Sequence, residues 1–110
     1  MEMRIEKIGD VTVVTLSGEL DASNAQKFKR DIAPVIEANV KVIFDVSQLR
    51  FIDSSGLAAL VSGLRLARAK GGIIALSGAQ SQAQIVFRLT MLDRVFPIHP
   101  TYQEAEQSLK

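Results

Sequence analysis

Apolar and polar residues alternate at the start of the chain, which is the spacing of a β-strand with one buried face. Residues 3–8 and 11–16 both show it, and the second run is rich in the β-branched residues that strands favour. The two runs flank Gly9-Asp10, a dipeptide typical of a tight hairpin turn. We therefore predict an antiparallel hairpin at the N-terminus.

Three later runs also predict strands. Residues 40–46 are apolar on both faces, as expected for an inner strand covered on both sides. One of those faces carries Val40, Val42, Phe44 and Val46. Residues 72–78 read as a short buried strand. Residues 94–99 read as an extended piece at the edge of a sheet, because Pro97 cannot donate to a neighbouring strand.

Between these runs the apolar spacing changes to that of helices. The first helix is predicted from Ser23, which forms a capping-box pattern with Gln26, to about Asn39. The second follows residue 53 and stops at Gly71-Gly72. Its buried face is predicted to carry Leu57, Leu60, Val61 and Leu64.

Two further helices are predicted towards the C-terminus. Residues 81–92 form the third, and a second capping-box pattern, Thr101 with Glu104, begins a fourth that runs through Leu109. The inward face of the third helix is predicted to carry Ile85, Val86, Leu89 and Leu92.

The resulting order, β-β-α-β-α-β-α-(β)-α, predicts an α/β fold with a mixed sheet built from a hairpin and parallel crossover units. A chain of 110 residues has room for one hydrophobic core, so residues 1–110 are expected to form a single domain. In such folds, functional groups cluster in the loops at the carboxyl ends of parallel strands.

Composition narrows the class of function. Lys and Arg number 13 against 12 for Asp and Glu, a net charge of +1 that predicts no direct binding of nucleic acid. No apolar run approaches the roughly 20 residues of a membrane span, and the N-terminus lacks the apolar stretch of a signal peptide. The chain has no cysteine, which excludes disulfides and thiolate metal sites. We expect a cytoplasmic protein without membrane insertion.

The most distinctive stretch is "RFIDSSGLAAL", where Asp53, Ser54, Ser55 and Gly56 separate the third strand from the second helix. Asp53, Ser55 and His99 supply the residue types of a nucleophilic triad, but "DSSG" is not the G-x-S-x-G elbow of hydrolases. The glycines match no phosphate-binding loop. We expect neither an enzyme nor a bound cofactor.

Carboxylates follow or end several of the strand patterns. Asp21, Asp45 and Asp53 could share one rim and attract a divalent ion, but charged side chains on loop rims are usually solvated. We therefore assign no metal site.

The serine pair has two readings. In the first, Asp53 or Ser54 merely caps the helix and Gly56 permits close packing. In the second, a hydroxyl in the first helical turn is open to phosphorylation, which adds about −1.5 to −2 charge where the helix terminus tolerates it. That charge would alter binding to a partner far more than folding.

The segments "LSGELDASNA", "VIFDVSQLRFIDSSGLAAL" and the stretch from Lys70 to Ala105 together resemble the bacterial anti-sigma factor antagonists, which are single STAS domains. The resemblance covers nearly the whole chain in the right order. It implies a mixed sheet with helices packed mainly on one face. It also implies a regulator of transcription that works by partner switching rather than catalysis.

In this family the antagonist binds an anti-sigma factor, a serine kinase of the histidine-kinase-like ATPase fold, and so releases a sigma factor. The kinase phosphorylates the antagonist and thereby ends the interaction, and a PP2C-type phosphatase resets it. By resemblance, Ser55 is the phosphorylated residue. The residues expected to face the partner are Asp21, Asp53, Ser54, Ser55 and Gly56.

Two alternatives stay open at this point. Some proteins that resemble this domain are architectural subunits of lipid-transporting ABC complexes, where they bind the ATPase subunit without a phosphorylation cycle. We expect a monomer, although the exposed edge of the opening hairpin leaves room for a weak dimer. The sequence does not identify the sigma factor or the pathway.

Overall fold

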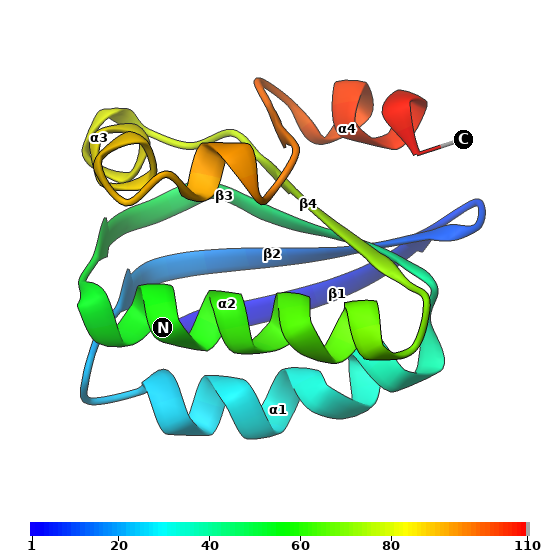
Figure 1. Cartoon of the computed structure of the whole chain (residues 1–110), viewed down its shortest axis with the longest axis horizontal. Coiled ribbons are helices and arrows are strands. Elements are labelled where there is room, and N and C mark those ends of the chain that lie inside the picture. The colour runs from blue at the N-terminus through cyan, green and yellow to red at the C-terminus, as the bar shows by residue number, and fades with distance from the viewer. Residues whose placement is uncertain (110) are drawn as a thin grey trace.

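The strands predicted from alternation form one mixed sheet, in the order in which they follow one another along the chain (Figure 1). The computed structural model describes residues 1–109. Strand β1 pairs antiparallel with β2, and the β2–β3, β3–β4 and β4–β5 pairs are parallel. The strands are β1 (Glu2–Ile8), β2 (Val11–Leu20), β3 (Lys41–Ile52), β4 (Ile73–Ser77) and β5 (Ile98–His99). The predicted fold class is confirmed.

Within residues 1–109, three helices and a short 3₁₀ helix connect the strands and a fourth helix follows β5, so the helices come in the predicted order. They are α1 (Ala25–Ala38), α2 (Ser54–Ala69), α3 (Ser81–Leu89), η1 (Leu92–Arg94) and α4 (Tyr102–Ser108). Helix α2 ends as expected, since Lys70 is its C-cap and Gly71 takes the left-handed φ of +75° that other residues avoid. The predicted hairpin is also present, with Ile8 opposite Val11 across the Gly9-Asp10 turn.

The two faces of the sheet are covered unequally. The larger core lies under α1, α2 and α3 and includes Phe28, Phe44, Leu60 and Phe87, all nearly inaccessible to water. The smaller core lies on the opposite face, where Ala105 and Leu109 at the end of the chain cover Val13 and Ile43. Helices therefore pack mainly on one face, as expected, and α4 alone covers part of the other.

Strand β3 is longer than predicted, because it continues from residue 46 to Ile52. Its register against β2 shifts twice, between Thr15 and Ser17 and again between Gly18 and Glu19. Each shift inserts an extra β3 residue, so the buried side chains after Val46 are Leu49 and Ile52. These buried residues are three positions apart, whereas the strand was predicted from buried residues at every second position. Val40 is exposed, because it precedes the strand.

The inward face predicted for the third helix is half right, because Val86 packs against the larger core and Leu92 is buried in it, but the other two residues are not. Ile85 and Leu89 are exposed, whereas Ala83 and Phe87 are buried. Leu92 is buried as predicted, but it belongs to η1. Met91, with a φ of +61°, redirects the chain between α3 and η1, so residues 85, 89 and 92 do not share one helical face.

Candidate functional site

The candidate site lies where two parallel strands end side by side. Leu20 and Ile52 are the last residues of β2 and β3 and are partners in the sheet register. Asp21 and Asp53 come directly after them, so the parallel pairing brings both carboxylates to one edge. We call the residues Asp21, Asp53, Ser54 and Ser55 the rim. The strand patterns predict that Asp21 and Asp53 share one rim, and the family resemblance adds Ser54 and Ser55 to the partner-facing side.

Asp53 fixes both loops of the rim. Its Oδ1 accepts the backbone N–H of Gly56 at 2.9 Å, which makes Asp53, not Ser54, the N-cap of α2. Its Oδ2 accepts the backbone N–H of Ala22 at 3.2 Å, in the loop between β2 and α1. One carboxylate thus holds the start of α2 and the neighbouring loop together.

Ser54 and Ser55 are the first two residues of α2, immediately behind this cap. Ser54 is exposed and Ser55 is half-buried. Within residues 1–109, neither hydroxyl takes part in a hydrogen bond. Both hydroxyls are therefore free to react or to bind a partner, and the helix N-terminus beside them favours negative charge.

Gly56 has a different role from its neighbours. It is buried, and a Cβ built on it would lie 2.5 Å from the backbone oxygen of Leu20 and 2.8 Å from Cγ1 of Ile52. No larger residue fits without movement of the backbone. Gly56 thus lets α2 begin directly against the end of β2, which sets the height of Ser55 above the sheet edge.

Asp21 organises the other half of the rim. Its Oδ1 accepts the hydroxyl of Ser23 at 2.5 Å and the backbone N–H of Ser23 at 2.9 Å. These two bonds, the hydroxyl first, hold the pKa of the Asp21 carboxyl below its ordinary value. The capping box predicted for Ser23 and Gln26 is not formed, because the Ser23 hydroxyl turns back to Asp21 and the helix starts one residue later, after Asn24.

The sequence analysis missed two side chains that support the rim. Asn24 accepts the backbone N–H of Asp21 at 3.0 Å and donates to the carbonyl of Glu19 at 2.8 Å. Gln82 of α3 accepts from the N–H of Ile52 and donates to its carbonyl, both at 3.3 Å. The Asp-x-x-Asn spacing could have indicated the first contact. No local signal predicts the second, which joins residues 30 positions apart.

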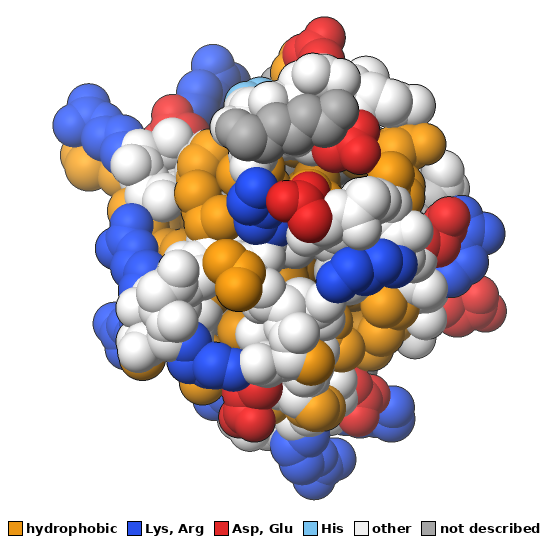
Figure 2. Space-filling view, turned by 90° about the vertical axis from the view of Figure 1, so that its right-hand side faces the viewer, with side chains coloured by type: hydrophobic (Ala, Val, Ile, Leu, Met, Phe, Trp, Pro, Cys, Tyr) orange, Lys and Arg blue, Asp and Glu red, His pale blue; other side chains and the backbone are white. Residues whose placement is uncertain are grey.

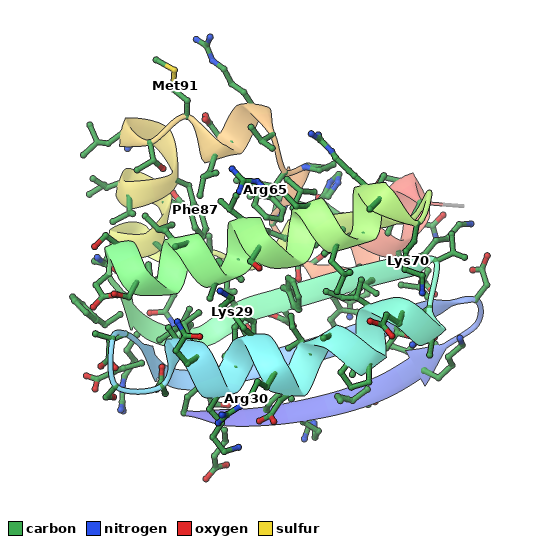
Figure 3. The ribbon with its side chains drawn as sticks, turned by 60° about the horizontal axis from the view of Figure 1, so that its bottom comes forward. Lys29, Arg30, Arg65, Lys70, Phe87 and Met91 are labelled. Carbon is green, nitrogen blue, oxygen red and sulfur yellow. The ribbon has the colours of Figure 1, made fainter. Side chains whose placement is uncertain are left out.

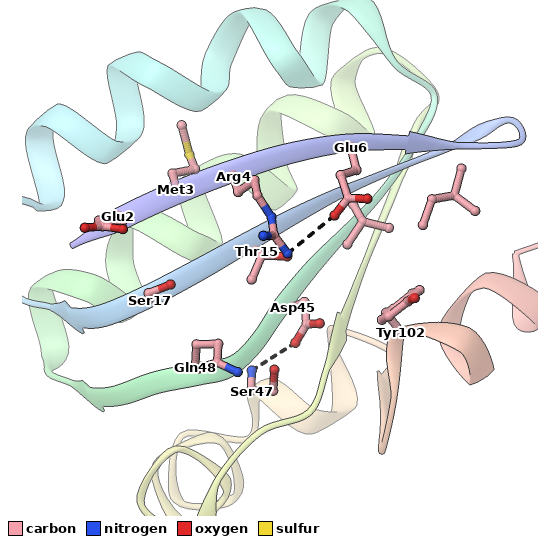
Figure 4. A pocket seen from close by; sticks show the side chains of 12 residues that line it. Glu2, Met3, Arg4, Glu6, Thr15, Ser17, Asp45, Ser47, Gln48 and Tyr102 are labelled. Atoms are coloured by element: carbon pink, nitrogen blue, oxygen red, sulfur yellow. Dashed lines mark hydrogen bonds and ion pairs between the residues drawn. The ribbon is translucent and has the colours of Figure 1, made fainter.

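Asp45 does not join the rim, although it was considered with Asp21 and Asp53 as a metal ligand. It lies within β3, and its Oδ1 accepts the backbone N–H of Ser47 at 2.9 Å. It lines a groove of about 460 Å³ together with Tyr102 and with Arg4 and Glu6 of β1, which form an ion pair at 3.6 Å along one side of it (Figure 4). Among residues 1–109 no three carboxylates or histidines are grouped as a metal site would need.

The structure also does not assemble the triad of Asp53, Ser55 and His99. His99 lies on β5, and its Nε2 is 3.1 Å from the hydroxyl of Ser108 in α4. His99 therefore does not lie beside Ser55. Within residues 1–109, Ser55 lacks the histidine base that a serine nucleophile of a triad needs.

Charge on the molecular surface is mixed. On the face seen in Figure 2, basic and acidic side chains are interspersed with apolar ones rather than gathered by sign. Within residues 1–109 no helix has the length and apolarity to cross a bilayer.

Nearly the whole chain matches one protein family. The STAS domain model matches residues 2–105. A Thermotoga maritima protein assigned to the anti-sigma factor antagonists is 29% identical over 105 residues, covering 94% of this chain and 93% of its own. The anti-sigma F factor antagonist of Paenibacillus polymyxa is 27% identical over 111 residues, covering 99% and 92%.

Solved structures of anti-sigma factor antagonists have a similar fold. The Thermotoga maritima crystal structure superposes with a TM-score of 0.91 at 28% identity, covering 96% of this chain and 92% of its own. The Bacillus cell fate determinant SpoIIAA, solved in its phosphorylated form, superposes with a TM-score of 0.77 at 24% identity, covering 99% and 100%. At that identity the second likeness supports the fold alone.

Proposed function

This chain belongs to the STAS domain family, and we propose that it acts as an anti-sigma factor antagonist switched by phosphorylation of Ser55. Its partner is an anti-sigma factor serine kinase of the histidine-kinase-like ATPase fold. Binding of that kinase releases a sigma factor, phosphorylation ends the binding, and a PP2C-type phosphatase restores it. The cycle takes place in the cytoplasm, where the sigma factor acts.

The position of the Ser55 hydroxyl carries this proposal. It lies in the first turn of α2 without a hydrogen-bond partner, between a fixed cap and the open edge of the sheet. A serine needed only to start the helix would be the cap itself, but that role belongs to Asp53. The hydroxyl is left available for modification by a partner.

The surroundings of Ser55 explain how a phosphate could switch binding without unfolding the domain. The terminus of α2 favours a negative charge by about 0.3–1 kcal/mol. The carboxylates of Asp53 and Asp21 on the same rim oppose it. These effects offset each other within the fold. In an interface, a desolvated phosphate beside two carboxylates costs several kcal/mol.

A phosphorylation assay tests the proposal. The chain is incubated with ATP and an anti-sigma factor serine kinase of the same organism, and the modified residue is mapped by mass spectrometry. We expect one phosphate, on Ser55, retained in a Ser54→Ala variant and lost in Ser55→Ala. Modification at another residue, or none by a kinase active on a control substrate, would contradict the proposal. Stable association with an ABC ATPase instead would favour the architectural role.

A further inference from the structure

An apolar patch on α3 and the turn after it has no role in the fold. Within residues 1–109, nine large hydrophobic side chains are exposed, and four of them fall within the eleven residues 85–95. These four, here called the α3 patch, are Ile85, Leu89, Met91 and Val95. Leu89 is 79% exposed, Met91 58% and Ile85 48%. Such a local concentration is typical of a surface that another molecule covers.

The backbone places Met91 outward at a conformational cost. Met91 has a φ of +61°, the one positive value at a non-glycine residue among residues 1–109. Non-glycine residues avoid this region because Cβ crowds the backbone. The turn directs the Met91 side chain away from the body of the molecule (Figure 3). The core gains nothing from that side chain.

The α3 patch begins close to the rim, to which the first turn of α3 is joined through Gln82 and Ile52. Gln82 lies one turn before Ile85, and Ile85 one turn before Leu89, so the three occupy neighbouring positions along α3. Gln82 is bonded to both backbone groups of Ile52, the residue directly before Asp53. Phe51, also exposed, lies at this strand end. A partner that covers Ser55 can therefore extend along this side of α3.

Unpaired arginines accompany the patch. Arg88 and Arg94 lie in the same segment, and Arg65 projects from α2 on the α3 side (Figure 3). None of the three has an ion pair or hydrogen bond within residues 1–109. One acidic residue, Asp93, lies among them. The complementary surface combines apolar side chains with carboxylates.

We infer that the α3 patch is a second docking area for the anti-sigma factor kinase, which presents apolar side chains flanked by carboxylates to it. The inference depends on the proposed function, because the kinase is the partner that must cover Ser55. The patch itself carries no phosphate. It therefore adds affinity to both forms of the chain, and the rim alone senses phosphorylation.

Steady-state phosphorylation of Ser55 separates docking from chemistry. In Leu89→Ser we expect KM for the antagonist to rise at least tenfold with kcat within twofold, because the rim is intact. The matched control is Val40→Ser, which removes an exposed apolar side chain next to Gly72, at the far end of α2. Its KM should stay within twofold. Thermal unfolding should be unchanged in both variants, since both side chains are exposed.

A charge reversal tests the second part of the inference. Arg88→Glu should also raise KM, and the salt dependence of KM should weaken, because an attraction screened by salt is removed. Arg30→Glu is the control, since Arg30 is also exposed and without an ion pair within residues 1–109 but lies on α1 (Figure 3). It should leave KM and its salt dependence unchanged.

The outcomes separate the two proposals. Phosphorylation of Ser55 with an unchanged KM in Leu89→Ser and Arg88→Glu would overturn the docking area and leave the proposed function intact. An equal loss in Val40→Ser would also overturn it. If Leu89→Ser instead abolished a dimer of the chain seen by sedimentation, the patch would be a self-association surface. If the wild-type chain were not phosphorylated, both proposals would fail.

Discussion

At the scale of single residues, the rim is held together by two carboxylates that accept hydrogen bonds from neighbouring loop residues. Asp53 divides its two oxygens between the N–H of Gly56 and the N–H of Ala22. One oxygen of Asp21 accepts hydrogen bonds from both the backbone N–H and the hydroxyl of Ser23. Each carboxylate thus closes one loop, and the bond from Ala22 to Asp53 joins the loops. Ser55 is held at a fixed height although its own hydroxyl bonds to nothing within residues 1–109.

The hydrogen bonds of Asp21 make its ionisation measurable. Because the Ser23 hydroxyl lowers the pKa of Asp21 most, Ser23→Ala should move that pKa back towards the ordinary carboxyl value. A lowered pKa means that Asp21 contributes stability above its unfolded-state pKa, about 3.9, and that this contribution is lost as pH falls through its folded-state pKa. The stability difference between wild type and Ser23→Ala should therefore shrink in acid. Carboxyl ¹³C NMR titration measures the pKa directly. A wild-type Asp21 that titrates at or above the ordinary value would refute the assignment.

At the scale of elements, replacement by alanine is predicted to change the stability differently at two glycines of α2. A Cβ at Gly56 would meet the backbone oxygen of Leu20, whereas one at Gly63 would meet the flexible Cδ1 of Ile36 at 3.3 Å. We expect Gly56→Ala to destabilise the fold by about 1–3 kcal/mol through overpacking. Gly63→Ala should lie within about 1 kcal/mol of wild type, because its gain in helix propensity offsets a small displacement. Urea unfolding measures both, and equal effects would contradict the account.

Element order was predictable from sequence because each element carries a local signal. Alternation marked the hairpin, and Gly9-Asp10 and Gly71-Gly72 marked its turn and the end of α2. What failed depends on contacts or geometry that no local pattern encodes. The register shifts in β3 are set by pairing with β2, and the break at Met91 removed Leu92 from the face of α3.

The candidate site was predictable to a similar extent. Parallel pairing of β2 with β3 was enough to bring Asp21 near Asp53 and Ser55. Which residue caps α2, and the support from Gln82, required the structure, because several polar residues in "DSSG" could serve as a cap. The α3 patch was not predicted, because two of its four residues, Ile85 and Leu89, were expected to face the core.

At the scale of the whole molecule, the rim that we propose as the switch site lies outside both cores. The larger core under α1, α2 and α3 and the smaller one under α4 contain no residue of the rim. A charge placed on Ser55 therefore desolvates no buried group. The domain can serve as a rigid support on which a single modification changes the surface and not the fold.

This separation predicts the behaviour of Ser55→Asp. Its free energy of unfolding should stay within about 1 kcal/mol of wild type, because the helix terminus favours the charge by about 0.3–1 kcal/mol and the like charge of the nearby Asp53 opposes it. Its affinity for the kinase should fall at least tenfold, since the carboxylate introduced at position 55 loses its solvent in the interface. Urea unfolding and titration calorimetry measure the two quantities. Gln103→Asp is the control, because it adds an equal charge to the first turn of α4, away from the rim, and should leave the affinity for the kinase unchanged. An affinity loss that matched a loss of stability would mean that the charge acts through the fold, whereas unchanged affinity would place the interface away from the rim.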